Sequence, residues 1–261
     1  MRLRAVLAVG FLLCCWGVLR AQKAFREYPA LEYVDFPLPP DYQAPHDWTF
    51  GRLMYPDPYG PNLYWSMDYP RSDRHVIAGI RRLTRIDARS VEQVVEPDGS
   101  DDIYNWPFLY AAEAGHWEVT PKVAEQLRDF LKRGGFLMFD DFHGEPEWEN
   151  FAFGMRQVLP DSPIEDLPND SPVFHTVYDL SQRVQVPGFG AWLSGRTYEK
   201  GGIDPHWRAA SDEKGRLVAV FCHNMDLGDA WEHSDDPVYP EHMASVAYRV
   251  AMNYAMYDLT H

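Results

Sequence analysis

One stretch decides the fold: Thr120–Asp141, which reads TPKVAEQLRDFLKRGGFLMFDD. Thr120 is a favourable helix cap and Pro121 suits the first helical position. Apolar residues then recur at spacings of three and four, which is typical of a helix with one buried face. Two glycines end this helix, and the uninterrupted apolar run Phe136–Phe139 predicts a buried central strand. The stretch therefore predicts a helix that leads directly into the middle of a sheet.

A second apolar run, Phe108–Ala112, precedes this helix and predicts a strand. A strand, a helix and a strand in this order form a right-handed crossover, which makes the two strands parallel. The rest of the chain adds strands at 49–54 and 91–95, a hairpin from 207–210 and 217–221, a helix capped by Ser72, and helices at 147–158 and 240–259. The expected fold is α/β: a doubly wound, mostly parallel sheet with helices on both faces and a C-terminal hairpin plus helix.

The N-terminal residues predict export. Residues 1–21 combine a basic start, a short apolar run and a small residue at Ala21, which is the pattern of a cleavable signal peptide. An uncleaved signal that anchors the protein in the membrane is the alternative. Residues 22–47 are rich in proline and predict an extended arm, and residues 48–261 suit a single domain. We expect a periplasmic or secreted protein.

Net charge and cysteine content limit the classes of partner and chemistry that we expect. The formal net charge is −15, and cleavage of the signal would remove three arginines. Such a charge repels phosphate backbones and anionic lipids, so nucleic acid is excluded as a partner, and a membrane is expected only through a retained signal. Cations, glycans and proteins remain open. Cys222 is the one cysteine beyond the signal, and a buried structural thiol is a simpler interpretation of it than a nucleophile.

Polar residues follow several of the predicted strands. In open α/β sheets, ligands bind at the carboxyl ends of the strands, so these residues should meet at one edge. Candidates for catalysis or for binding a divalent cation are Asp140, Asp141, His143 and His223. Candidates for ligand binding are Asp68, Arg71, His116, Asn224, Asp226, Asp229 and Trp231.

The adjacent pair Asp140 and Asp141 is the sharpest of these features, because two acids after a buried strand need a cation, hydrogen bonds or a raised pKa. A structural alternative is that Asp140 caps the amides of a loop while Asp141 is solvated. A cation site and acid/base catalysis are the functional alternatives. The sequence carries no phosphate-binding glycine loop, catalytic serine motif or zinc motif.

Several motifs resemble one bacterial family, the domain-of-unknown-function 4159 family. They are Asp68-Tyr69-Pro70, Pro107-Phe108-Leu109-Tyr110, Gly134-Gly135-Phe136-Leu137 with Asp140-Asp141-Phe142, and Cys222-His223-Asn224 with Asp226-Leu227-Gly228-Asp229. The resemblance implies a flavodoxin-like sheet similar to class I glutamine amidotransferases. It implies no activity, and the Gly-x-Cys-x-Gly elbow of the amidotransferase nucleophile is missing from this sequence.

Three hypotheses follow for the function. The first is a binding module of the bacterial envelope that lacks the cysteine nucleophile and holds a small-molecule ligand or an envelope protein. The second is a hydrolase, with or without a metal, that uses the Asp/His residues at the carboxyl ends of the strands. The third treats the acids as a scaffold that only orders the loops.

Overall fold

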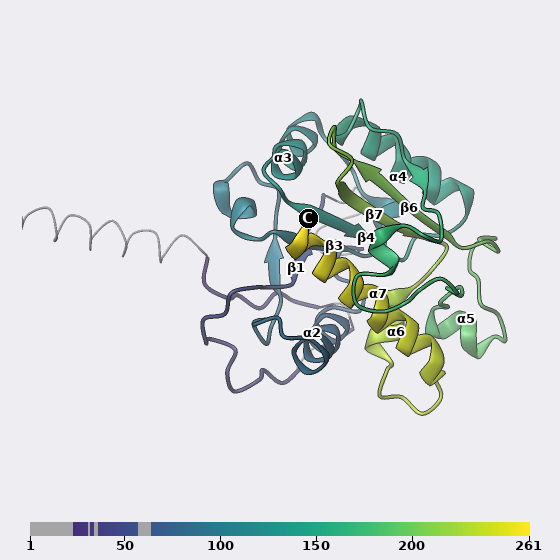
Figure 1. The fold of residues 1–261 in the computed structure, drawn as a ribbon. Helices are drawn as coiled ribbons and strands as arrows, with labels where there is room; N and C mark the ends of the chain where they lie inside the picture. The colour runs from purple at the N-terminus through teal and green to yellow at the C-terminus, as the bar shows by residue number, and fades with distance from the viewer. Residues whose placement is uncertain (1–22, 31, 34–35, 57–63) are drawn as a thin grey trace, which may run out of the picture.

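A seven-stranded sheet forms the centre of the protein (Figure 1). The computed structural model describes residues 23–30, 32–33, 36–56 and 64–261. The strands lie in the order β2-β1-β3-β4-β7-β6-β5. Their bounds are β1 Gly51–Leu53, β2 Gln93–Val95, β3 Phe108–Ala111, β4 Phe136–Phe139, β5 Glu165–Asp166, β6 His206–Ser211 and β7 Leu217–His223.

The first five strands of that order are parallel, and β6 and β5 complete one edge in antiparallel pairing. The predicted α/β fold with a mostly parallel sheet is confirmed. The order β2-β1-β3-β4 reverses between β1 and β3, as it does in flavodoxin-like sheets.

The four predicted helices occur in the expected order: α2 Arg71–Leu83, α3 Pro121–Lys132, α4 Gly144–Val158 and α7 Glu241–Thr260. Two short helices, α5 Phe189–Leu193 and α6 Leu227–Glu232, were not predicted. Thr120 caps α3 as predicted, because its side chain accepts a hydrogen bond from the amide of Val123. The predicted cap of α2 at Ser72 is wrong: the helix begins one residue earlier, and the Ser72 hydroxyl instead accepts a hydrogen bond from Arg52.

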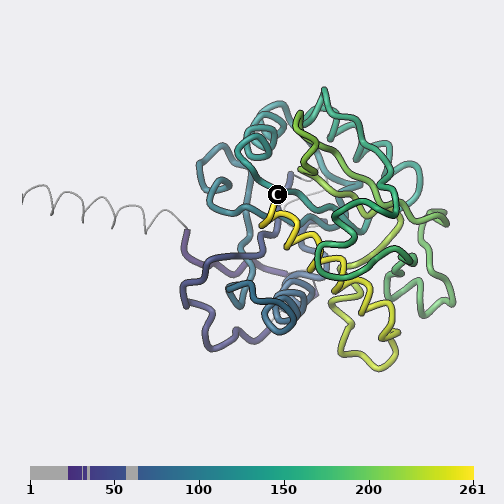
Figure 2. Tube along the Cα trace, viewed as in Figure 1, coloured from purple at the N-terminus to yellow at the C-terminus, as the bar shows by residue number. Residues whose placement is uncertain are grey.

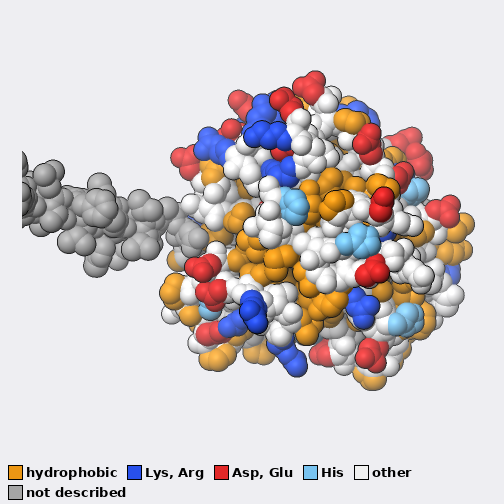
Figure 3. Space-filling view, in the orientation of Figure 1, with side chains coloured by type: hydrophobic (Ala, Val, Ile, Leu, Met, Phe, Trp, Pro, Cys, Tyr) orange, Lys and Arg blue, Asp and Glu red, His pale blue; other side chains and the backbone are white. Residues whose placement is uncertain are grey.

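Two buried hydrophobic clusters lie on opposite faces of the sheet, because successive side chains of a strand point to opposite sides. One cluster joins Phe108, Tyr110 and Met138 to apolar residues of α2, α6 and α7. The other joins Leu109 and Phe139 to apolar residues of α3 and α4. Figure 2 shows α7 passing in front of the sheet in this view. On the same face, hydrophobic side chains gather toward the middle, and acidic and basic ones lie around its rim (Figure 3).

The described part of the N-terminal arm packs against the domain, although it contains neither helix nor strand. Arg74 of α2 pairs with Glu27 at 2.8 Å and donates a hydrogen bond to the carbonyl of Phe36. Further along the arm, Glu32 accepts a hydrogen bond from the amide of Asp68, and Tyr33 donates one to Glu232. The predicted signal, residues 1–21, lies outside the described residues. No helix in the described residues has both the length and the apolar character that a membrane span requires.

Two phenylalanines of α4 provide a matched test of the core. Phe151 is fully buried and lies 4.5 Å, ring centroid to ring centroid, from Phe142, whereas Phe153 is 60% exposed. We expect Phe151→Ala to lower the free energy of unfolding by about 3–5 kcal/mol, because it removes buried area and leaves a cavity. Phe153→Ala should change it by no more than about 0.5 kcal/mol. Urea unfolding of both variants measures the difference, and equal losses would contradict this packing.

Candidate functional site

The loops that follow β4 and β7 are bonded to one another. The amide of Asp141 donates to the carbonyl of Met225 at 3.1 Å, and the amide of Asn224 donates to the carbonyl of Phe142 at 3.0 Å. Both loops leave the carboxyl ends of adjacent parallel strands. Polar residues that are about 80 positions apart in the sequence therefore become neighbours.

Asp140 is the buried link between these loops. Its Oδ2 atom accepts hydrogen bonds from the amides of Leu227 and Gly228, at 2.6 and 3.0 Å, and from the Tyr110 hydroxyl at 3.3 Å. Burial raises the pKa of Asp140, and the charge of Asp141 raises it further, while the two amides oppose the shift. Asp140 thus caps the start of α6, which was the structural alternative for this residue.

Asp140 is one of five aspartates that lie close together and are called the acidic cluster below: Asp68, Asp140, Asp141, Asp226 and Asp229. All except Asp229 are buried. Asp226 caps α6 by accepting from the amide of Asp229 at 2.8 Å, and Asp229 in turn accepts from the amide of Phe189 at 2.6 Å. Both side chains are thus held by backbone groups.

Burial and repulsion from neighbouring carboxylates raise the pKa values of the four buried members, Asp68, Asp140, Asp141 and Asp226. For Asp68 the pKa rises first through burial and then through Asp229 and Asp141. For Asp226 burial again comes first, followed by Asp141 and Asp229. Each charge therefore makes its neighbours harder to ionise.

The two nearby basic side chains are already paired elsewhere. Arg52 is fully buried and binds Asp73 at 2.8 Å, along with the backbone carbonyls of Trp65 and Met67. Lys200 binds Glu147 at 2.7 Å. No lysine or arginine of the described residues therefore forms an ion pair with the acidic cluster, whose nearby basic partners are the histidines His143 and His233.

His223 and Asn224 have structural contacts. His223 Nε2 lies 3.2 Å from the carbonyl of Gly144, and its Nδ1 lies 3.2 Å from Arg208, so Nε2 carries the proton and Nδ1 accepts. Burial lowers the pKa of His223 to about 4, so its ring is neutral near pH 7. Asn224 accepts from the amide of Gly144 and donates to the carbonyl of Asp204.

The side chains of Asp141 and His143 contact each other directly, with Asp141 Oδ1 3.1 Å from His143 Nε2. Burial raises the pKa of Asp141, and the charges of Glu113 and Asp229 add to the effect. Burial lowers the pKa of His143. Opposite shifts bring the two pKa values together, which favours proton exchange between the side chains.

His116 belongs to a neighbouring group with two glutamates. Its Nδ1 lies 3.1 Å from Glu113 and its Nε2 lies 3.6 Å from Glu147, while its ring stacks on Tyr64 at 3.8 Å. Burial acts to lower the pKa of His116, but the hydrogen bond and charge of Glu113 outweigh it and the pKa rises. The position of Glu113 directly beyond β3 places it at this edge of the sheet, as the rule for carboxyl ends of strands predicts, whereas Glu147 and Lys200 were not predicted as site residues.

Three residues highlighted in the sequence lie elsewhere. Arg71 binds Asp235 at 2.7 Å, on the outer side of α2. Trp231 was predicted to bind ligand, but it is fully buried, 5.2 Å from the ring of Tyr110, and so serves the core. Cys222 is also fully buried, and burial raises the pKa of its thiol.

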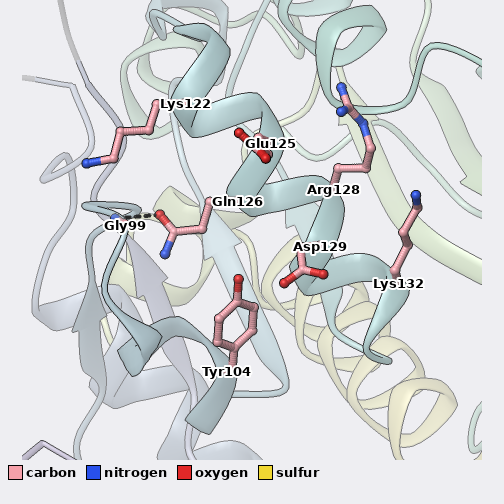
Figure 4. Close-up of a pocket in the computed structure, with 8 residues that line it drawn as sticks. All are labelled: Gly99, Tyr104, Lys122, Glu125, Gln126, Arg128, Asp129 and Lys132. Carbon is pink, nitrogen blue, oxygen red and sulfur yellow. Dashed lines mark hydrogen bonds between the residues drawn. The ribbon is translucent and has the colours of Figure 1, made fainter.

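A separate open groove of about 460 Å³ runs along α3 (Figure 4). The Gln126 side chain accepts from the amide of Gly99 at 2.7 Å and donates to the carbonyl of Ser100. Lys122 donates to the carbonyl of Asp98. These contacts fasten the loop before β3 to α3, and the groove contains none of the residues of the acidic cluster.

Four groups of described side chains have the spacing to hold a metal ion. Asp68, Asp226 and Asp229 each place an oxygen within 4.8 Å of the others, and the same spacing holds for Glu113 with His116 and Glu147, for Asp229 with Glu232 and His233, and for Glu32 with Asp68 and Glu232. All three members of the first group belong to the predicted ligand-binding residues. The four residues predicted as metal candidates from the sequence make the other contacts described above.

Fold and site together define an α/β protein with a mostly parallel sheet and a buried acidic site beyond its strands. Residues 49–259 match the family model described as a domain of unknown function (DUF4159), so the chain belongs to that family. No curated protein matches the chain significantly.

Glu232, beside the acidic cluster, should make stability depend on pH. Burial raises the pKa of Glu232 from 4.5 to about 8; the hydrogen bond from Tyr33 opposes this shift and the charge of Asp229 adds to it. The folded state therefore binds this proton more tightly than the unfolded state, and the resulting stability is lost as pH rises from about 4.5 through about 8.

We expect Glu232→Gln to match the native protein in stability at pH 4.5 and to exceed it at pH 9, because glutamine stays neutral. Urea unfolding at a series of pH values measures both curves. Parallel curves for the two proteins would contradict this assignment.

Proposed function

We propose that this protein is an exported module of the bacterial envelope that binds a ligand or partner at the acidic cluster. The observation that carries the proposal is a buried group of carboxyl groups with which no lysine or arginine of the described residues forms an ion pair. A buried charge without a partner is costly, so a bound cationic group would be stabilised there.

The topology supports the same location. Asp68 follows β1 and Glu113 follows β3, and the strand order reverses between these two strands. Ligands of open α/β sheets bind outside the carboxyl ends of the strands at such a reversal. A resemblance to the class I glutamine amidotransferase fold belongs to this proposal, and the buried Cys222 is consistent with a module that has lost the nucleophile of that class.

Cationic probes test the binding proposal. Spermidine, a lysine-rich peptide and a chitosan oligomer would be titrated into the protein by calorimetry at pH 7.5 with EDTA present. We expect one of the three to bind, and Asp141→Asn to weaken that binding by about tenfold or more, since one contact of about 1.4 kcal/mol is worth that factor.

Binding should also release protons, because a cationic ligand favours ionised carboxylates whose pKa values are raised in the free protein. The control is Asp161→Asn, which makes the same charge change at an exposed position. Absence of binding for all three probes, or equal affinity in Asp141→Asn and the native protein, would count against the proposal.

A hydrolase is the second candidate, and the contact between Asp141 and His143 favours it. In this scheme Asp141 and His143 share the proton that a general acid–base reaction transfers. Turnover of chromogenic esters, amides or glycosides that disappears in both Asp141→Asn and His143→Gln, but persists in Asp161→Asn, would favour the enzyme over the binding module.

Export is tested separately from ligand binding. We expect residues 1–47, fused to a reporter enzyme that is active only outside the cytoplasm, to give activity in a bacterial host. Residues 22–47 alone should give none. Equal activity from the two fusions would contradict an export signal in residues 1–21.

A further inference from the structure

The three side chains of Asp68, Asp226 and Asp229 are arranged as ligands of one ion. Each offers an oxygen atom, and these atoms all lie within 4.8 Å of one another. Two oxygens bound to the same Ca²⁺ are at most about 5.2 Å apart, because each lies about 2.3–2.6 Å from the ion. The spacing therefore suits a shared cation.

Asp68 provides an independent observation that points to a ligand. Its side chain is almost fully buried, with 4% of its surface exposed, and its Oδ2 atom has no hydrogen-bond partner among the described residues. An unpaired carboxylate oxygen in a buried position is unfavourable unless something binds it. A β-carbon at Gly228 would overlap this Asp68 oxygen and lie 3.5 Å from Asp226 Oδ1, so the two carboxylates border the same space.

Two glycines, Gly188 and Gly228, lie close to the carboxylate oxygens of this group. A side chain at Gly228 would overlap Asp68 Oδ2, and a β-carbon at Gly188 would lie 2.7 Å from Asp226 Oδ2 and 3.1 Å from Asp229 Oδ2. The chain thus excludes water from part of the surroundings of these atoms. Electrostatic attraction to a cation is stronger in such surroundings than in water.

The donor set selects the kind of ion. All three donors are carboxylate oxygens, and hard cations such as Ca²⁺ and Mg²⁺ prefer oxygen, whereas structural zinc sites use mainly cysteine and histidine. Backbone hydrogen bonds already orient two of the three carboxylates: Asp226 accepts from the amide of Asp229, and Asp229 accepts from the amide of Phe189. A carboxylate oxygen has lone pairs enough to accept such a bond and still bind an ion.

We propose that Asp68, Asp226 and Asp229 bind one hard divalent cation, with Ca²⁺ preferred because it accepts the varied geometry of three carboxylates and further water ligands. The ion rests on the proposed function, since it would itself be the cationic group that the acidic cluster stabilises. The proposed site differs from one built on Asp140 or His223, because neither residue belongs to a group of described side chains with the spacing to hold an ion.

The experiment uses the full chain, treated with EDTA and dialysed, and the metals alone as probes. CaCl₂ and MgCl₂ are titrated by calorimetry at pH 7.5, and thermal unfolding is followed with each. We expect one equivalent of Ca²⁺ to bind and to raise the unfolding temperature. Absence of heat together with an unchanged unfolding temperature would overturn the proposal.

Two variants locate the site. Asp68→Asn removes a charge without removing a hydrogen bond of Oδ2, and Asp226→Asn keeps an oxygen to accept from the amide of Asp229. Each should weaken Ca²⁺ binding by about tenfold or more. Asp166→Asn makes the same charge change at an exposed position on β5 and should bind as the native protein does.

Circular dichroism of the metal-free variants controls for folding, and Tb³⁺ luminescence displaced by Ca²⁺ gives a second readout in the native protein. Native affinity in both folded cluster variants would overturn the proposal. So would a loss confined to Glu147→Gln, which would place the ion at the neighbouring group with His116. Because the organic probes of the previous section are titrated in EDTA, failure of the cation site and failure of ligand binding are separate results.

Discussion

The site depends on the pair of hydrogen bonds that Asp140 accepts from the amides of Leu227 and Gly228. They join the end of β4 to the loop after β7, and so fix where α6 begins. Asp226 and Asp229 lie at that beginning and receive their positions from it. A buried carboxyl group that accepts hydrogen bonds from two amides holds these two loops together, because each amide would otherwise be buried without a hydrogen-bond partner.

These hydrogen bonds also bring several carboxyl groups of the same charge close together. Burial raises the pKa values of Asp68, Asp140, Asp141 and Asp226, and each of these groups also experiences repulsion from another carboxylate. By contrast, the buried charge of Asp73 is directly neutralised by Arg52. Among the described residues, Asp73 thus has a direct arginine partner, whereas the acidic cluster has no lysine or arginine partner. Structural ion pairing accounts for the first group, and the binding site proposed above would account for the second.

Local signals predicted the sheet and its main helices. The continuous apolar run of β4 and the Thr120-Pro121 start of α3 depend on neighbouring residues only, and both are found where expected. The start of α4 at Gly144, three residues ahead of the predicted one, and the uncapped start of α2 depend on tertiary contacts of Asn224 and Arg52.

Less of the candidate site than of the sheet and helices could be predicted from the sequence. The rule for carboxyl ends of strands placed Asp140, Asp141 and His223 near one another, but only coordinates show which of their atoms are already bonded. Lys200 was missed because no pattern in the sequence reveals that it approaches Glu147. Trp231 was misjudged because an aromatic residue beside acids is equally compatible with a core position.

The contacts of the N-terminal arm change how the limits of this domain should be drawn. The family match begins at residue 49, yet the amide of Asp68 donates to Glu32 and the carboxyl group of Glu232 accepts from Tyr33. A chain trimmed to the matched segment would retain every described strand and helix, apart from the last residue of α7, and would still lose the side chains of Glu32 and Tyr33 beside the acids. Similarity between family members therefore delimits the scaffold, while the immediate environment of the acids extends into a segment that the family comparison leaves out.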